Sequence, residues 1–138
     1  MVVEQQRTRT QGFRDLDVYQ RSFALVRPIY DLLDSWPPIE RYDLASQIRR
    51  AAKSIPANIG EGYALRTDAP RLFCKHLRIA YGSAVEMQIH FDLALELGYV
   101  SEEVHRRFLN EYEVLGKMLY RLWQHWRAKL PQDAQNDV

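Results

Sequence analysis

The stretch Phe73–Ala94, FCKHLRIAYGSAVEMQIHFDLA, carries the strongest structural signal in this sequence of 138 residues. Its apolar positions recur alternately every four and every three residues, at Phe73, Leu77, Ala80, Ala84, Met87, Phe91 and Ala94. This spacing puts them on one face of an α-helix and continues for about three heptads. We expect Thr67 or Asp68 to cap this helix, Pro70 to lie in its first turn and Gly98 to end it.

Three further segments show a helical period. Their apolar positions are Tyr19, Phe23, Val26, Tyr30 and Leu33 in the first, and Leu44, Ile48, Ala51 and Ile55 in the second. In the last they are Val104, Phe108, Tyr112, Leu115, Leu119, Leu122 and Trp126, with Ser101 as the predicted N-cap. Asp43 is the predicted N-cap of the second helix.

Prolines interrupt two of these segments. Pro28 is expected to kink or shorten the first helix, and Pro56 to bend or end the second near Ser54, before a flexible Gly60-Glu61-Gly62. The Pro37-Pro38 pair predicts an extended linker between them.

These observations predict an all-α fold. Short connections between four helices favour an antiparallel up-down-up-down four-helix bundle over residues 13–128. Residues 1–12 are expected to form a flexible N-terminal segment and residues 129–138 a disordered tail.

The bulk composition is that of a globular protein. Its hydrophobic content is 46%, and its length fits one domain with a real core. With one cysteine, Cys74, there is no intrachain disulfide, which favours a reducing compartment. No secretory signal and no membrane-spanning run is visible, so we expect a cytoplasmic protein.

The net charge of +1 conceals a marked asymmetry along the chain. Residues 44–81 carry seven cations against two carboxylates, a net charge of +5. Residues 82–126 carry four cations against seven carboxylates, a net charge of −3. An asymmetric charge distribution of this kind is informative about binding partners and not about the fold.

Three blocks carry a family resemblance: FRDLDVYQ at 13–20, SQIRRAAKSIPANIGEGY at 46–63 and LRIAYGSAVEMQIHFDLALELGYVS at 77–101. With them the chain resembles the bacterial four-helix-bundle proteins encoded by intervening sequences within 23S rRNA genes. More distantly, it is similar to the accessory variability determinants of diversity-generating retroelements. The family motif includes Arg49-Arg50 and Glu61, whereas Pro28 departs from the family pattern.

The resemblance implies a homo-oligomer, a pentamer, with a basic surface facing nucleic acid. It also suggests a reverse transcriptase or a ribosomal component as a partner.

The leading candidate site is a set of six cations. Arg71, Lys75 and Arg78 share one outward helix face, and Arg49 and Lys53 form an i, i+4 pair with Arg50 alongside. If the two helices are neighbours, these cations line one surface suited to phosphates, with Tyr63 and Tyr81 as stacking partners. The alternative is a solvated face, or salt bridges to a neighbouring subunit.

Two further groups each have two interpretations. Pro56, Asn58 and Glu61 are interpreted mainly as structural: Asn58 satisfies carbonyls freed by the proline, and Glu61 pairs with Arg49 or Arg50. A catalytic Glu61 would need a second group, which the sequence lacks. Tyr120, Trp123 and Trp126 pack in the core or anchor a subunit interface.

No cofactor or metal site is predicted. Glu102 and His105 match a carboxylate-histidine pair of di-iron bundles only once, and Glu86 and His90 are expected simply to pair. Cys74 is expected to be an inert thiol.

We therefore expect a non-enzymatic, homo-oligomeric nucleic-acid-binding protein, with RNA as the favoured ligand. The alternative is a protein-interaction scaffold or accessory subunit, for example one that docks a reverse transcriptase.

Overall fold

The computed structural model describes residues 12–138, and every regular element in this range is helical. The elements are η1 (Phe13–Asp15), α2 (Asp17–Ala24), α3 (Val26–Leu33), η2 (Pro38–Tyr42), α4 (Leu44–Ala64), α5 (Pro70–Glu96), α6 (Glu102–Arg127) and η3 (Gln132–Asp137). The all-α prediction is confirmed. The predicted flexible segment 1–12 lies outside the described residues except for Gly12.

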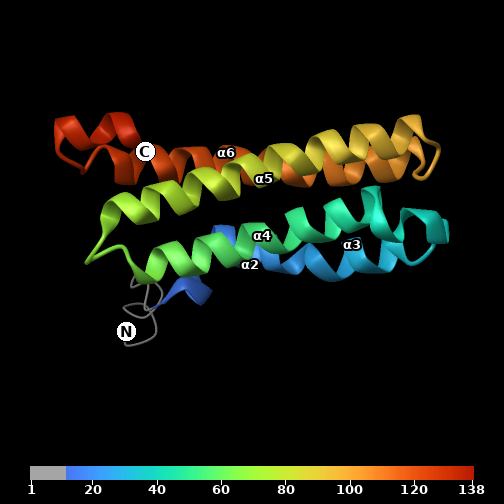
Figure 1. Cartoon of the computed structure of the whole chain (residues 1–138), viewed down its shortest axis with the longest axis horizontal. Helices are drawn as coiled ribbons and strands as arrows, with labels where there is room; N and C mark the ends of the chain where they lie inside the picture. Colours follow the sequence, from blue (N-terminus) through green and yellow to red (C-terminus); the bar gives the residue numbers. More distant parts are fainter. Residues whose placement is uncertain (1–11) are drawn as a thin grey trace, which may run out of the picture.

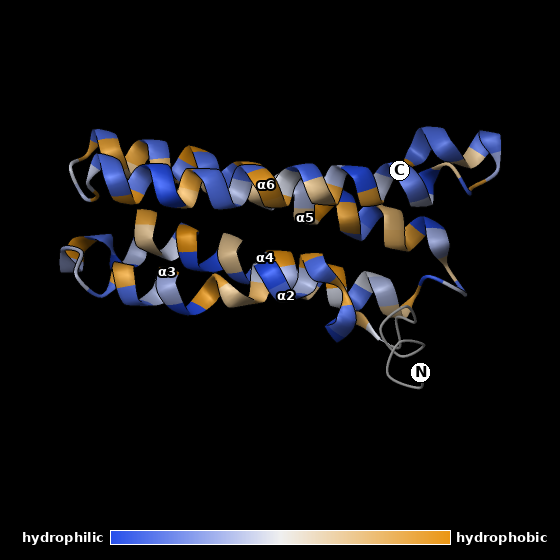
Figure 2. Cartoon of the chain, turned by 180° about the vertical axis from the view of Figure 1, so that it is seen from behind, coloured by the Kyte–Doolittle hydropathy of each residue, from blue (hydrophilic) through white to orange (hydrophobic). Residues whose placement is uncertain are grey.

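The long helices lie side by side (Figure 1). Helices α2 and α3 follow one another and flank α4, α4 packs along α5, and α5 packs along α6. Hydrophobic and hydrophilic bands alternate along each long helix, as expected for helices with one buried face (Figure 2). Within residues 12–138, no helix is both long and apolar enough to cross a membrane.

The core is built mainly from the seams of the three longest helices. All seven predicted positions of α5 are fully buried, and the four predicted positions of α4 are buried too. In α6, the central positions Phe108, Tyr112, Leu115 and Leu119 are buried, and the outer three are partly buried. These three seams are confirmed.

The seam of the first segment is shifted by one residue from the prediction at its first four positions, whereas Leu33 is buried as predicted. Its buried positions are Val18, Ser22, Leu25, Ile29 and Leu33, whereas the predicted Phe23 is 59% exposed. Ser22 conceals the true period because it is polar. Its hydroxyl donates to the Tyr19 carbonyl at 3.1 Å, which satisfies the group in the core.

The two internal prolines have different outcomes. Helix α2 ends at Ala24 and α3 begins at Val26, so the predicted interruption by Pro28 is confirmed. Pro28 has no backbone N–H to donate to the Ala24 carbonyl, and its ring crowds that carbonyl. In contrast, α4 continues through Pro56 to Ala64, so of the two expected outcomes, a bend or an end near Ser54, the end is wrong.

The predicted flexible glycines are also part of α4. Gly60 and Gly62 lie inside the helix and are buried. One lost hydrogen bond at Pro56 is outweighed by packing on both sides of the helix. Tertiary contacts therefore override a local breaker signal here.

Two predicted caps are replaced by other groups. The Asp43 side chain makes no capping bond; instead the Leu44 amide donates to Glu40 Oε2 at 3.0 Å. Glu40 lies in η2, which occupies the position of the predicted extended linker. Its Oε1 accepts a hydrogen bond from the Tyr99 hydroxyl at 2.6 Å. At α5 the N-cap is Ala69, without a side-chain bond, so neither Thr67 nor Asp68 caps it.

Two other helix ends follow the sequence closely. The Val104 amide donates to the Ser101 hydroxyl at 3.2 Å, which confirms the α6 cap. Gly98 adopts a φ of +77° after α5. The Tyr99 amide donates to the Ala94 carbonyl and the Gly98 amide to the Leu95 carbonyl, which is the Schellman pattern that favours glycine.

The C-terminal residues differ from the predicted disordered tail. They include η3 and fold back so that Leu130 and Val138 are buried with Cys74. An apolar residue at each end of the polar run PQDAQND explains this packing. A prediction from the polar composition of the tail takes no account of these two apolar residues.

Candidate nucleic-acid interface

The six predicted cations divide between two sides of the molecule. Helices α4 and α5 are neighbours, as the single-surface hypothesis requires. However, α4 faces α5 through Ser54, whose hydroxyl accepts from Ser83, and through Asn58, which contacts His76. Arg49 and Lys53 lie on the other edge of α4. The hypothesis that six cations line one surface is therefore wrong.

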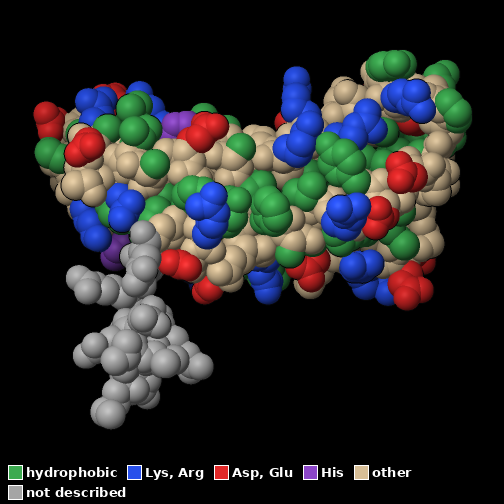
Figure 3. All heavy atoms as spheres, turned by 90° about the horizontal axis from the view of Figure 1, so that it is seen from below, with side chains coloured by type: hydrophobic (Ala, Val, Ile, Leu, Met, Phe, Trp, Pro, Cys, Tyr) green, Lys and Arg blue, Asp and Glu red, His purple; other side chains and the backbone are tan. Residues whose placement is uncertain are grey.

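The three α4 cations lie in different surroundings: Lys53 is beside α2, Arg49 contacts η2, and Arg50 is one turn before Ser54 on the side toward α5. Arg49 Nη2 donates to the Arg41 carbonyl at 2.6 Å, and Arg50 is exposed. Lys53 and Glu61 border a groove of about 500 Å³ with Phe13, Tyr19, Phe23, Val26, Pro56, Ala57 and Gly60. Hydrophobic side chains gather along the middle of this face, with cations scattered around them (Figure 3).

The α5 cations lie toward α6 and the C-terminal residues. Arg71 pairs with Asp137, with Nη2 3.1 Å from Oδ2, and Lys75 is exposed. Arg78 lines a small pocket of about 120 Å³ with Tyr81, Tyr120 and Trp123. Among the three α5 cations, Arg78 is therefore the one that lines a pocket with aromatic side chains.

The three aromatic rings form a continuous cluster across α5 and α6. The Tyr81 and Tyr120 centroids are 5.7 Å apart, and those of Tyr120 and Trp123 are 5.5 Å apart. Tyr120 is exposed, whereas Tyr81 and Trp123 are partly buried. A base can stack on such a platform with little sequence preference.

A larger groove of about 440 Å³ continues from the cluster. Exposed Lys117 and Arg121 line it, together with Tyr81, Val85, Gln88, Glu113, Gly116, Tyr120 and Gln124. Three cations, counting Arg78, thus surround the aromatic cluster against one carboxylate. We call Arg78, Tyr81, Lys117, Tyr120, Arg121 and Trp123 the aromatic–cationic face.

Helical spacing explains how the sequence builds this face. Lys117 and Arg121 are an i, i+4 pair, and Tyr120 follows Gly116 by the same interval, so each pair shares a side of α6. Gly116 forms part of the groove wall. A Cβ added there would lie 3.8 Å from the Gln88 side chain and 3.9 Å from the Tyr81 ring.

Sequence reasoning found part of this face. It named Arg78 as a phosphate contact, Tyr81 as a stacking partner, and Tyr120 and Trp123 as interface aromatics. It missed Lys117 and Arg121 because charges were summed by chain segment, and both lie in the acidic second half. Their spacing around Tyr120 was the available signal.

Two other aromatics are unavailable for stacking. Tyr63 is buried beneath Arg66, whose guanidinium carbon lies 3.9 Å from its ring centroid. Trp126 packs edge-on against Phe73 at 5.0 Å between centroids. Its contacts match the core interpretation of this residue.

The motif residues of α4 organise packing. Asn58 Nδ2 donates to the Ser54 carbonyl at 2.9 Å, and Asn58 Oδ1 lies 2.9 Å from His76 Nδ1. Asn58 therefore bonds within its own helix and to α5, but not to the carbonyl that Pro56 frees, which belongs to Ala52. A Cβ on Gly62 would lie 2.6 Å from the His76 Cβ, so close approach to α5 requires glycine.

Glu61 does not make its predicted pairs. It lies eleven residues from Arg50 in one continuous helix, a rise of about 17 Å. No salt bridge to Glu61 is present among residues 12–138.

Three of the four histidines, His76, His90 and His105, pair with a carboxylate or an amide. His90 Nε2 lies 3.2 Å from Glu86 Oε2, as predicted, and His105 Nε2 lies 2.8 Å from Asp92 Oδ1. Within the described range, no three His, Cys, Asp or Glu side chains are grouped as metal ligands would be.

Comparisons with known proteins agree with this architecture. The model of the 23S rRNA-intervening sequence protein family matches residues 14–121. A crystal structure of a protein of unknown function from the S23 ribosomal protein family, from Bacteroides thetaiotaomicron, is similar with a TM-score of 0.69. It is 24% identical, and the alignment covers 78% of this chain and 95% of that one. Curated proteins gave no match.

Proposed function

This chain belongs to the 23S rRNA-intervening sequence protein family, and we propose that it is a non-enzymatic nucleic-acid-binding protein that favours RNA. The carrying observation is the aromatic–cationic face on α5 and α6. It combines three rings in tilted contact with three cations within two neighbouring grooves. The groove beside Lys53 also has aromatic side chains, but it holds one cation against one carboxylate, that of Glu61.

The chemistry of this face suits a flexible strand. Cations bind phosphates without reading sequence, and an aromatic platform accepts any base. Each stacked base contributes about 1–3 kcal/mol when measured by alanine substitution. An unpaired strand exposes its base faces, whereas a duplex hides them, so single-stranded RNA is the favoured ligand.

A salt series with matched charge variants tests the proposal. Fluorescence anisotropy would measure binding of a single-stranded RNA, an rRNA fragment and duplex DNA. For a single strand, R78Q/K117Q/R121Q should reduce the slope of log K against log salt by about 2, since three phosphate contacts are lost. R49Q/R50Q/K53Q makes the same charge change on α4 and should leave the slope nearly unchanged.

The control variant also separates the competing outcomes. If the α4 variant weakens binding instead, the interface lies on α4 and the proposed face is wrong. If the unmodified protein binds none of the probes at low salt, nucleic-acid binding itself is refuted.

We propose further that the chain self-associates through the outer face of α5. Five exposed apolar residues share that face: Leu72, Ile79, Ile89, Leu93 and Leu97. An exposed apolar stripe of this kind is typical of an interaction site. Light scattering should give a mass above one chain, and I79D/L93D should lower it to 16.3 kDa. The control, I39D, changes an exposed residue of η2.

A monomeric unmodified protein would refute self-association. The stripe would then favour the scaffold alternative, in which another protein docks on it.

We also infer that the four helical segments run antiparallel, up-down-up-down. The contacts support this inference because residue numbers rise on one helix as they fall on the next. Ser54 meets Ser83 and Asn58 meets His76 between α4 and α5. Between α5 and α6, Asp92 meets His105, Tyr81 meets Tyr120 and Phe73 meets Trp126.

A further inference from the structure

The C-terminal residues close over the beginning of α5. After α6 ends at Arg127, the chain turns back through η3. Leu130 and Val138 bury themselves against Cys74 in a small apolar cluster that is separate from the main core. The contact is compact and involves few side chains, so it can open without disturbing the bundle.

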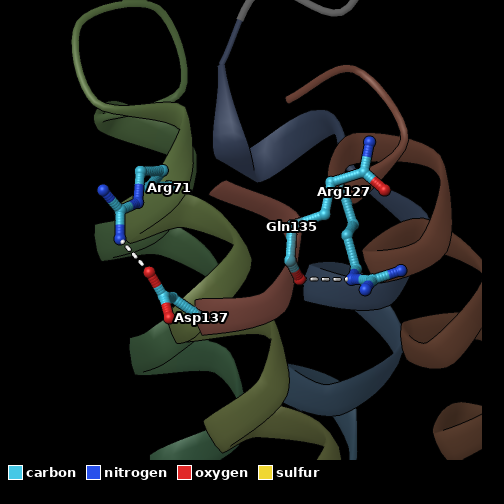
Figure 4. A network of polar contacts seen from close by, with 4 residues as sticks. All are labelled: Arg71, Arg127, Gln135 and Asp137. Atoms are coloured by element: carbon cyan, nitrogen blue, oxygen red, sulfur yellow. Dashed lines mark hydrogen bonds and ion pairs between the residues drawn. The ribbon is translucent and has the colours of Figure 1, made fainter. Parts of the chain in front are cut away.

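Polar contacts hold the same segment in place (Figure 4). Arg71 pairs with Asp137 across 3.1 Å, and Arg127 Nε donates to the Gln135 carbonyl at 2.8 Å. The Gln135 amide in turn donates to the Leu130 carbonyl at 2.9 Å. The side chains of Arg71 and Asp137 are 50% and 64% exposed, so this ion pair is weak and sensitive to salt.

The segment adjoins the aromatic–cationic face. Trp123 belongs to that face through Tyr120 and also packs against the cluster around Cys74. The Arg127 guanidinium carbon lies 5.4 Å from the Trp123 ring centroid. Cys74 and Arg78 are one turn apart on α5, so the closed segment borders the proposed phosphate contacts.

We propose that residues 131–138 form an autoinhibitory strap that competes with nucleic-acid phosphate for the cations beside this face. In the closed state the Asp137 carboxylate pairs with Arg71, and the Gln135 carbonyl accepts a hydrogen bond from Arg127. A phosphate presents the same kind of anionic oxygen as Asp137, so a bound strand displaces the strap. Opening adds Arg71 and Arg127 to the interface. This inference rests on the proposed function.

Cys74 provides an independent reporter of strap opening. Its side chain is fully buried under the strap. Burial raises the pKa of the Cys74 thiol, an effect that the charge of Arg127 opposes in part. The closed protein should therefore react slowly with a maleimide, and reaction should accelerate when the strap leaves.

Two variants and one control test the strap. A chain that ends at Leu130 removes the strap. D137N keeps the packing of Val138 and removes only the competing charge. N136A, an exposed neighbour, is the matched control. Maleimide labelling of Cys74 and the salt series with single-stranded RNA are measured for each.

We expect the shortened chain to label at least tenfold faster and to bind RNA with a slope steeper by about 1.4, which corresponds to two added phosphate contacts. D137N should steepen the slope by about 0.7, and N136A should change neither measurement. Unchanged labelling of the shortened chain, or RNA binding unaffected by both the truncation and D137N, overturns the strap. If no variant binds RNA, both this inference and the proposed function fail.

Discussion

Glycine substitutions offer a direct measure of how closely α4 approaches α5. In Gly62→Ala, the new methyl group would lie 2.6 Å from the His76 Cβ and 2.9 Å from Phe73 Cδ1. The His76 Cβ is fixed to the α5 backbone, so the helices must separate. Overpacking of this kind costs about 1–3 kcal/mol. The higher helix propensity of alanine returns about 1 kcal/mol.

The net expectation for Gly62→Ala is a loss of up to about 2 kcal/mol in the free energy of unfolding. Gly82→Ala is the matched control, because its Cβ would meet no atom within 4 Å. It should stabilise the protein by about 0.5–1 kcal/mol. Gly60→Ala, 3.3 Å from the Phe13 ring, should fall between them because that ring can shift.

Urea denaturation would rank the three variants. With an m-value of about 2 kcal/mol/M, Gly62→Ala should lower the midpoint of the urea transition by up to about 1 M, and Gly82→Ala should raise it. The m-value should stay constant, which shows that stability rather than compactness changed. Equal stability of Gly62→Ala and Gly82→Ala would refute the close packing of α4 on α5.

Three further outcomes are expected. S54C/S83C should form a disulfide on mild oxidation, because the two hydroxyl oxygens are 3.0 Å apart; failure to cross-link on non-reducing gels would contradict the helix register. Glu40→Ala should cost about 1–2 kcal/mol in denaturation experiments because it removes the α4 cap, whereas Asp43→Ala should cost little. Burial raises the pKa of Tyr112 in the folded protein above its ordinary value of 10.0. The free energy of unfolding should therefore be unaffected by this group below pH 10, and it should fall above pH 10, where the phenol ionises in the unfolded chain. Tyr112→Phe should reduce this alkaline loss, and an unchanged pH profile would argue against a buried Tyr112 hydroxyl.

Much of the fold follows from apolar period alone. The α5 seam contains apolar side chains without exception, so its pattern determines both the helix and its buried face. In the first segment, one polar residue in the core was enough to shift the predicted seam. Ser22 is buried because its hydroxyl finds a carbonyl on its own helix, a possibility that hydropathy does not include.

The remaining errors concern contacts between distant parts of the chain. Asp43 has the right residue type and position for a cap, yet Glu40 takes the role because Tyr99 holds its carboxylate from 59 residues away. The residues of the aromatic–cationic face also come from distant parts of the chain. Arg78 and Arg121 belong to segments of opposite net charge and meet only when α5 packs along α6.

The bridge through Glu40 has a consequence for how the protein opens. One carboxylate ties the entry to α4 to the connection between α5 and α6, so neither segment can detach without breaking a bond that also holds the other. That end of the molecule should behave as one cooperative unit in native-state hydrogen exchange. The backbone amides of Leu44 and Tyr99, both hydrogen-bonded, should then exchange with the same opening free energy although they lie far apart in the sequence.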